Sequence, residues 1–85
     1  MLLGMRTIDT DELEARLGPN LRRIRRNAEL TQTQLADLIG IKQSDISRYE
    51  RGESIPRGRR LTKLADKLNV DVAELFEKHI EDNGT

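Results

Sequence analysis

Residues 31–52 read TQTQLADLIGIKQSDISRYERG, and this stretch decides the fold. Its first half places three apolar residues on one face at helical spacing: Leu35, Ala36 and Ile39. In its second half, Ile46 and Tyr49 stand three residues apart, again on one helix face. Gly40 lies between the two patterns, and glycine readily takes the left-handed conformation that ends one helix and turns the chain into the next. The stretch therefore predicts a helix-turn-helix, whose second helix can enter the major groove of DNA.

A family resemblance rests on the same residues and their neighbours. It is carried by Leu30-Thr31-Gln32, Leu35-Ala36, Gly40-Ile41, Ile46-Ser47-Arg48-Tyr49-Glu50 and Gly52. Together these residues resemble the phage-repressor (Cro/cI-type) helix-turn-helix family, and the likeness runs over about residues 17–76. Because it needs many residue types at fixed spacing, the pattern is far more specific than a lone glycine between two short helices. The resemblance implies an all-α, repressor-like fold and sequence-specific binding of double-stranded DNA.

Length and composition limit the class of protein. The chain has 85 residues, a formal net charge of zero and no cysteine. It is long enough for one small domain, and no disulfide or thiolate metal site stabilises it. No apolar run approaches the roughly 20 residues of a membrane-spanning helix, and residues 1–5 are too short for the apolar core of a signal peptide. We expect a cytoplasmic protein without a membrane segment.

The zero net charge conceals a strongly basic middle. Residues 1–14 carry one Lys or Arg against four Asp or Glu, a charge of −3. Residues 15–70 carry 13 against 6, a charge of +7, and residues 71–85 carry one against five, a charge of −4. The basic block coincides with the helix-turn-helix, so a neutral protein can still bind phosphate locally. Ordinary solvated helix surface explains some of these charges, but it does not explain why the basic residues coincide with the helix-turn-helix.

The sequence pattern predicts short helices along the rest of the chain. Apolar spacing and capping residues predict five of them, over residues 19–27, 32–39, 43–51, 57–68 and 72–76, the last able to continue to Ile80. Gly18-Pro19 marks a boundary, and residues 11–17 can form a short helix that is either docked or loose. We expect an all-α, compact five-helix bundle. It would have an N-terminal extension over residues 1–18, a helix-turn-helix domain over residues 19–80 and a flexible tail over residues 81–85.

Several turn positions have an expected conformation. Glu29 stands where the family usually has glycine, so we expect a left-handed backbone there, with a small cost in strain. Asn69 is also expected to leave its helix in the left-handed conformation. Thr31 and Gln34 have the spacing of a capping box, which predicts a helix start at residue 32.

The second helix of the motif would read bases with its first two turns. Its outward-facing polar residues are Gln43, Ser44, Ser47 and Arg48. Glutamine can pair with adenine through two hydrogen bonds, arginine with guanine, and serine with either. The alternative is that these are ordinary exposed polar residues. Asp45 beside them could either accept from cytosine or favour the helix N-terminus.

Phosphate contacts need hydrogen-bond donors around that helix. The candidates by position and residue type are Thr31, Gln32, Gln34, Lys42, Arg51 and Arg57. The resemblance implies the role of Gln32, since the family binds phosphate through the residue at this position. Three further arginines are auxiliary candidates for phosphate contacts, although each alone is typical of solvated surface. They are Arg22, Arg23 and Arg26.

The resemblance also assigns a structural role to two charges. Phage repressors pair an arginine late in the first helix with a glutamate late in the reading helix, and the matching residues here are Arg25 and Glu50. Pairing with a planar guanidinium would keep this acid from repelling phosphate on a DNA-facing helix. Tyr49 could either pack within the protein or stack on DNA.

One reading helix covers too few base pairs, so we expect a homodimer on a palindromic operator. The expected interface is the stripe Val72, Phe76 and Ile80, unless Phe76 instead completes the core of the monomer. The expected function is that of a transcription repressor, with RNA polymerase as a further partner. The alternative is a protein-interaction module, such as an antitoxin that holds a toxin. Nothing indicates an enzyme, a cofactor or a metal site, and the single histidine, His79, has no neighbouring ligands.

Overall fold

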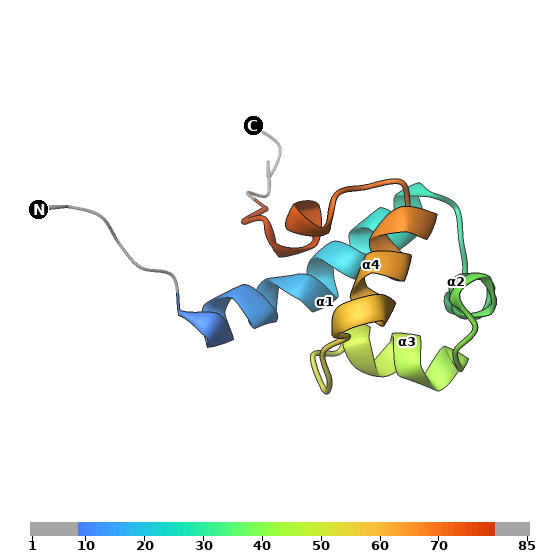
Figure 1. Cartoon of the computed structure of the whole chain (residues 1–85), viewed down its shortest axis with the longest axis horizontal. Coiled ribbons are helices and arrows are strands. Elements are labelled where there is room, and N and C mark those ends of the chain that lie inside the picture. The colour runs from blue at the N-terminus through green and yellow to red at the C-terminus, as the bar shows by residue number, and fades with distance from the viewer. Residues whose placement is uncertain (1–8, 80–85) are drawn as a thin grey trace, which may run out of the picture.

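Four α-helices and one short 3-10 helix make up the described part of the chain. The computed structural model describes residues 9–79, so the expectations for residues 1–8, Ile80 and the tail lie outside the described part. The elements are α1 (Thr10–Asn27), α2 (Gln32–Ile39), α3 (Gln43–Glu50), α4 (Gly58–Lys67) and the 3-10 helix η1 (Val72–Phe76). α1 spans the molecule, α2 and α3 meet at one end, and η1 lies against α1 on the side away from α3 (Figure 1). The expected all-α helix-turn-helix fold is confirmed, with four α-helices and a 3-10 turn instead of five α-helices.

α1 is one continuous helix, and the helix boundary expected at Gly18-Pro19 is wrong. The helix is capped by Asp9, whose Oδ1 accepts a hydrogen bond from a first-turn amide at 2.9 Å. A proline inside a helix removes one backbone hydrogen bond and costs about 3 kcal/mol. Burial offsets this cost, because Leu17 and Leu21 on either side of Pro19 are fully buried. The division of the chain into an extension and a domain at residue 18 stays a prediction.

Gly18 marks a close crossing of two backbones. A Cβ atom at this position would lie 2.6 Å from the carbonyl oxygen of Glu50 and 2.9 Å from that of Tyr49. Both oxygens belong to the backbone at the end of α3, so neither can move aside as a flexible side chain does. α1 and α3 thus meet main chain to main chain, which requires a residue without a side chain.

Gly18→Ala is expected to destabilise the protein by about 1–3 kcal/mol, the usual cost of overpacking a tight contact. In an open helix the same change would stabilise by about 1 kcal/mol, because alanine is the better helix former. Pro19→Ala is the matched control: Pro19 is exposed and its replacement restores a helical amide, so stability should not fall. Urea unfolding measures both variants. A Gly18→Ala protein as stable as the wild type would refute the close crossing.

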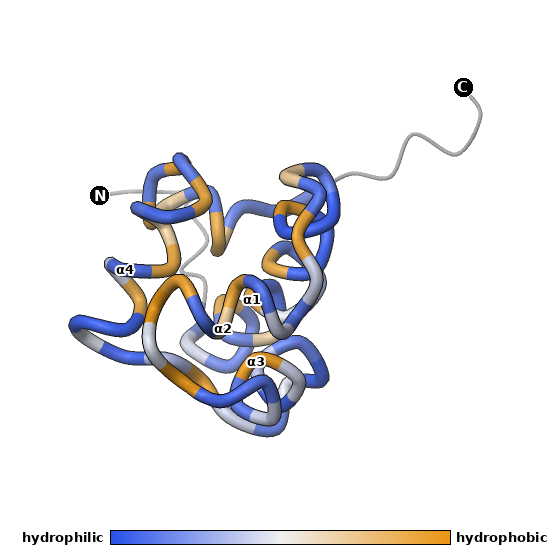
Figure 2. The backbone as a smooth tube through the Cα atoms, turned by 90° about the vertical axis from the view of Figure 1, so that its right-hand side faces the viewer, coloured by the Kyte–Doolittle hydropathy of each residue, from blue (hydrophilic) through white to orange (hydrophobic). Residues whose placement is uncertain are grey.

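All five elements contribute to one apolar core. The fully buried apolar side chains include Leu17, Leu21, Leu35, Ile46, Leu64 and Leu75. Hydrophobic and hydrophilic residues alternate along the helices, as expected of helices with one buried face (Figure 2). Tyr49 is also buried, at 5% exposure, and its hydroxyl accepts a hydrogen bond from Arg60 at 2.8 Å. Of the two roles considered for Tyr49, packing within the protein is the one that this geometry supports.

Three of the helix exits with a left-handed backbone are ones where the sequence predicts it. Gly40 between α2 and α3 has a φ of 76°, Glu29 after α1 has a φ of 61°, and Asn69 after α4 has a φ of 58°. At the first of these turns, the Ile41 amide donates to the Ala36 carbonyl at 3.0 Å, which satisfies an acceptor at the end of α2. Glutamate at such a position carries strain that glycine would not.

The last element differs from the expected α-helix. Over residues 72–76 the chain forms a 3-10 helix that ends at Phe76, and Ile80 lies outside the described part. A 3-10 helix has about three residues per turn, so residues four apart do not share one face. Val72 and Phe76 therefore do not form the single stripe that α-helical spacing predicts.

Side chains of α1 explain where η1 ends. Asn20 donates from Nδ2 to the carbonyl oxygens of Leu75 at 3.0 Å and Glu77 at 2.8 Å. Arg16 donates to the carbonyl oxygen of Phe76 at 3.3 Å. These carbonyls are satisfied by α1 instead of by a further helical turn. The same bonds attach the first half of α1 to η1, so this part of the chain is docked and not loose.

Candidate nucleic-acid interface

Two side chains cap the N-terminus of α2. Thr31 Oγ1 accepts from the Gln34 amide at 3.0 Å, and Gln34 Oε1 accepts from the Thr31 amide at 2.8 Å. This is the capping box that the sequence predicts. Both residues are also candidates for phosphate binding. The box uses their side-chain oxygens, which leaves the Gln34 NH2 group as a donor at the start of α2.

Lys42 precedes the first residue of α3 and makes no side-chain capping hydrogen bond. Asp45 Oδ2, in the first turn, accepts from the Lys42 amide at 3.3 Å and so partly replaces the cap. Its other oxygen accepts from Arg48 one turn later, and Arg60 lies 3.8 Å from Oδ2. The Asp45 carboxylate is surrounded by donors of its own protein, which favours the helix N-terminus role over a contact with cytosine.

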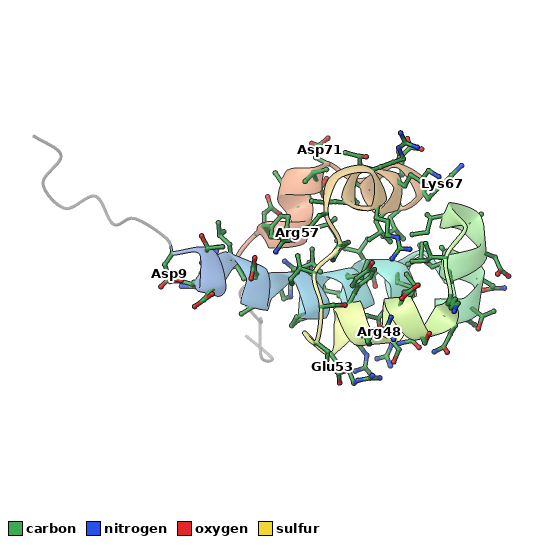
Figure 3. All side chains as sticks on the ribbon, turned by 60° about the horizontal axis from the view of Figure 1, so that its bottom comes forward. Asp9, Arg48, Glu53, Arg57, Lys67 and Asp71 are labelled. Carbon is green, nitrogen blue, oxygen red and sulfur yellow. The ribbon has the colours of Figure 1, made fainter. Side chains whose placement is uncertain are left out.

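The residues expected to read bases lie on α3 opposite its buried face. Gln43, Ser44 and Arg48 are exposed, and Ser47 is half-buried. Figure 3 shows Arg48 on the outer side of α3. Its side chain is 44% exposed and paired with Asp45, while Arg51 donates to Ser47. Exposed pairs of this kind contribute at most about 1 kcal/mol, so both arginines can exchange partners when a ligand arrives.

A chain of hydrogen bonds links α1, α2 and α3. Glu50 Oε2 accepts from Arg25 Nε at 2.6 Å, and Oε1 accepts from Arg25 Nη2 at 3.0 Å. Oε1 also accepts from Gln32 Nε2 at 3.0 Å. Gln32 Oε1 in turn accepts from Gln43 Nε2 at 2.6 Å. The expected Arg25–Glu50 pair is present, and the chain extends it to two of the residues expected to bind DNA.

The Arg25–Glu50 pair is buried, with side chains 8% and 4% exposed. Arg25 also donates from Nη1 to the Leu30 carbonyl at 2.8 Å, so three of its nitrogens are engaged. The acid at the end of the reading helix is thus neutralised within the protein. The resemblance pointed to the pair but not to the link through Gln32. That residue stands 18 positions before Glu50, and no local pattern signals the contact.

The cations expected to bind phosphate divide between two places. Lys42 and Arg51 flank α3 and are exposed. Arg51 donates to both oxygens of Glu53, at 2.7 and 3.2 Å, and this hydrogen-bonded guanidinium lowers the pKa of the Glu53 carboxyl. Figure 3 shows Glu53 on the α3 side of the molecule and Arg57 apart from it. Arg57 instead borders a groove beside the first turns of α1.

The remaining candidate residues, for auxiliary phosphate contacts and for the dimer interface, lie outside α3. Arg22, Arg23 and Arg26 line a groove beside Glu50. On η1, Val72 and Phe76 are half-buried and pack against the core. η1 lies across α1 from α3 (Figure 1), so these two residues are away from the reading face.

The described part of the chain contains neither a cluster of metal-ligating side chains nor a membrane-spanning helix. Among residues 9–79 no group of acidic and histidine side chains could hold a metal ion, and His79 is exposed. No helix of this part is both long and apolar enough to cross a membrane.

Comparison with known proteins gives a family and two named relatives. Residues 21–75 match the helix-turn-helix family HTH_3. Over 45 residues the chain is 44% identical to the cryptic phage CTXphi transcriptional repressor RstR of Vibrio cholerae serotype O1, covering 53% of this chain and 40% of the relative. Over 59 residues it is 30% identical to antitoxin PezA of Streptococcus pneumoniae serotype 4, covering 69% of this chain and 37% of the relative. The matches span well under half the length of either relative.

Two solved structures have the same arrangement of helices. The P22 c2 repressor in complex with a synthetic operator matches with a TM-score of 0.69 and 28% identity, covering 72% of this chain and 92% of that one. The restriction-modification controller C.AhdI from Aeromonas hydrophila matches with a TM-score of 0.69 and 32% identity, covering 80% of this chain and 100% of that one. The family match covers more than half of this chain. The chain therefore belongs to the HTH_3 helix-turn-helix family, of the Cro/cI repressor type.

Proposed function

We propose that this protein binds double-stranded DNA sequence-specifically through α3 and represses transcription in the cytoplasm. The observation that carries the proposal is the hydrogen-bonded chain of Glu50, Gln32 and Gln43, anchored by Arg25. It neutralises the acid on α3 and holds two amide side chains at the edge of the open face. A face ordered in advance loses less side-chain freedom on binding. The likenesses to RstR and to the operator-bound P22 c2 repressor support the same function.

The proposal includes a homodimer on a palindromic operator. Half-sites one helical turn apart, about 34 Å, are read by two copies of a recognition helix related by a two-fold axis. The surface proposed for the partner includes the half-buried Val72 and Phe76, with Ile80 as a further candidate. η1 carries the first two of these residues away from α3, so dimer formation would leave the reading face open.

Arg48→Ala and Gln43→Ala are each expected to cost about 1–3 kcal/mol of discrimination between the cognate site and random DNA. Arg48 must first leave Asp45, an exposed pair that costs at most about 1 kcal/mol to break. Lys63→Ala is the control, because Lys63 is exposed on α4 and not on α3. Affinities are measured for a duplex enriched from random sequences and for a scrambled duplex. Full affinity and discrimination in both α3 variants would show that this face does not read bases.

A second candidate function is protein binding, in which the same fold holds a toxin. The likeness to antitoxin PezA favours it. A gel shift separates the two candidates: salt-sensitive binding to DNA supports the repressor. A complete lack of DNA affinity in the folded protein supports the protein-binding module.

A further inference from the structure

An apolar groove of about 400 Å³ separates the first turns of α1 from the segment that leads into α4. Its apolar lining consists of Leu13, Ile55, Pro56, Leu61 and Phe76. The first turns of α1 project beyond the rest of the molecule and form one wall (Figure 1). Leu13 on this wall is half-buried, and a partner seated in the groove would remove its remaining apolar surface from water.

The projecting turns of α1 lie outside the family match, which begins at residue 21. They are also held in place. Arg16 donates to the Phe76 carbonyl at 3.3 Å and to Glu12 at 3.0 Å, and Asn20 binds the end of η1. The wall is therefore a preformed surface that needs no ordering before a partner binds.

Two charged residues face the groove from opposite sides. Glu14 comes from α1, and Arg57 directly precedes the first residue of α4. Neither makes an ion pair within the described part of the chain. A two-fold interface brings the same patch of both copies together, so that residue i of one meets residue j of the other and the reverse. A patch with an acid on one side and a base on the other is complementary to itself under such a rotation.

We propose that a second copy of this chain occupies the groove, with Glu14 of each protomer facing Arg57 of the partner copy. The inference rests on the homodimer of the proposed function, and it extends the interface from Phe76 to the first turns of α1. The segment that lines the groove follows the end of α3, over residues 55–58. A partner seated there would therefore also fix the spacing between the two reading helices.

The test is a charge exchange between copies, read by analytical ultracentrifugation of the full chain at low salt without DNA. Glu14→Arg and Arg57→Glu should each raise the dissociation constant of the dimer at least about tenfold, because each places like charges together twice per dimer. An equimolar mixture of the two variants should dimerise again. In the mixed dimer both contacts pair opposite charges.

Matched controls separate this pairing from a general effect of charge. Asp11→Arg makes the same change of charge in the same turns, and Arg59→Glu does so near the start of α4, but neither residue lines the groove. Both controls should dimerise like the wild type. Circular dichroism confirms that each variant is folded, and recovery in the mixture is itself evidence of two folded chains.

Several outcomes would overturn the proposal. Single variants that dimerise like the wild type would move the interface elsewhere. A mixture that stays monomeric would show that Glu14 and Arg57 do not meet across copies. A monomeric wild type would remove the dimer altogether. None of these results removes DNA binding by α3, which a gel shift with the same preparations reports separately.

Discussion

Glu50→Ala is expected to destabilise the protein by about 3–5 kcal/mol, because it leaves the charge of Arg25 buried without a partner. The Glu50 carboxylate accepts three hydrogen bonds, two from Arg25 and one from Gln32. The expected loss is a large part of the roughly 5–10 kcal/mol that holds a domain of this size folded. Urea unfolding at low temperature measures the free energy of unfolding while the variant is still folded without denaturant.

Two further variants separate the buried pair from charge in general. Glu53→Ala breaks the exposed pair with Arg51, in which the side chains are 52% and 56% exposed, and it should leave the urea midpoint close to that of the wild type. Replacing both members of the buried pair by apolar residues, as in Arg25→Met with Glu50→Leu, should recover part of the loss. If Glu50→Ala unfolds at the same urea concentration as the wild type, the pair contributes nothing and the buried-charge argument is wrong.

The helix-turn-helix could be predicted from the sequence because its signals are local. Leu35, Ile39 and Ile46 recur at helical spacing, and Gly40 supplies the left-handed turn. The left-handed exit at Glu29 followed from the family pattern and is confirmed. Such signals depend on a few neighbouring residues, so they survive without knowledge of the tertiary contacts.

The start of the first helix and the form of the last one could not be predicted in this way. Gly18 and Pro19 are local signals of a helix boundary, yet α1 continues through them. The reasons are the burial of Leu17 and Leu21 and the backbone crossing with α3, which involve residues about 30 positions away. Likewise η1 is a short 3-10 helix whose carbonyls are bound by Asn20 and Arg16 from α1.

The sequence could predict which residues of α3 are exposed, but not the hydrogen bonds between the side chains of the candidate site. Burial of Ile46 and Tyr49 fixes which face of α3 is open, so the exposed donors followed from periodicity. The link from Gln32 to Gln43 joins two helices through side-chain conformations, which periodicity does not determine. Arg57 was assigned to phosphate by its place after α3, but it borders the groove beside α1.

The second large expected effect is the dependence of DNA affinity on salt concentration. A dimer that contacts about 6–10 phosphates is expected to lose roughly three to five decades of DNA affinity between 50 and 200 mM salt, because each neutralised phosphate releases bound counterions. The motivation is the charge of +7 over residues 15–70, where the reading helix lies. Lys42 and Arg51 flank that helix and are exposed to a ligand. A purely apolar or protein-directed surface would not respond to salt in this way.

Titration of the wild-type chain against DNA at several salt concentrations tests sequence-specific DNA binding most directly. The two ligands are a duplex enriched from random sequences and a scrambled duplex of the same length. We expect a steep fall of affinity with salt for both duplexes, with the enriched one bound about 1,000-fold more tightly or better. Equal affinity for the two duplexes, or an affinity that does not change with salt, would contradict it.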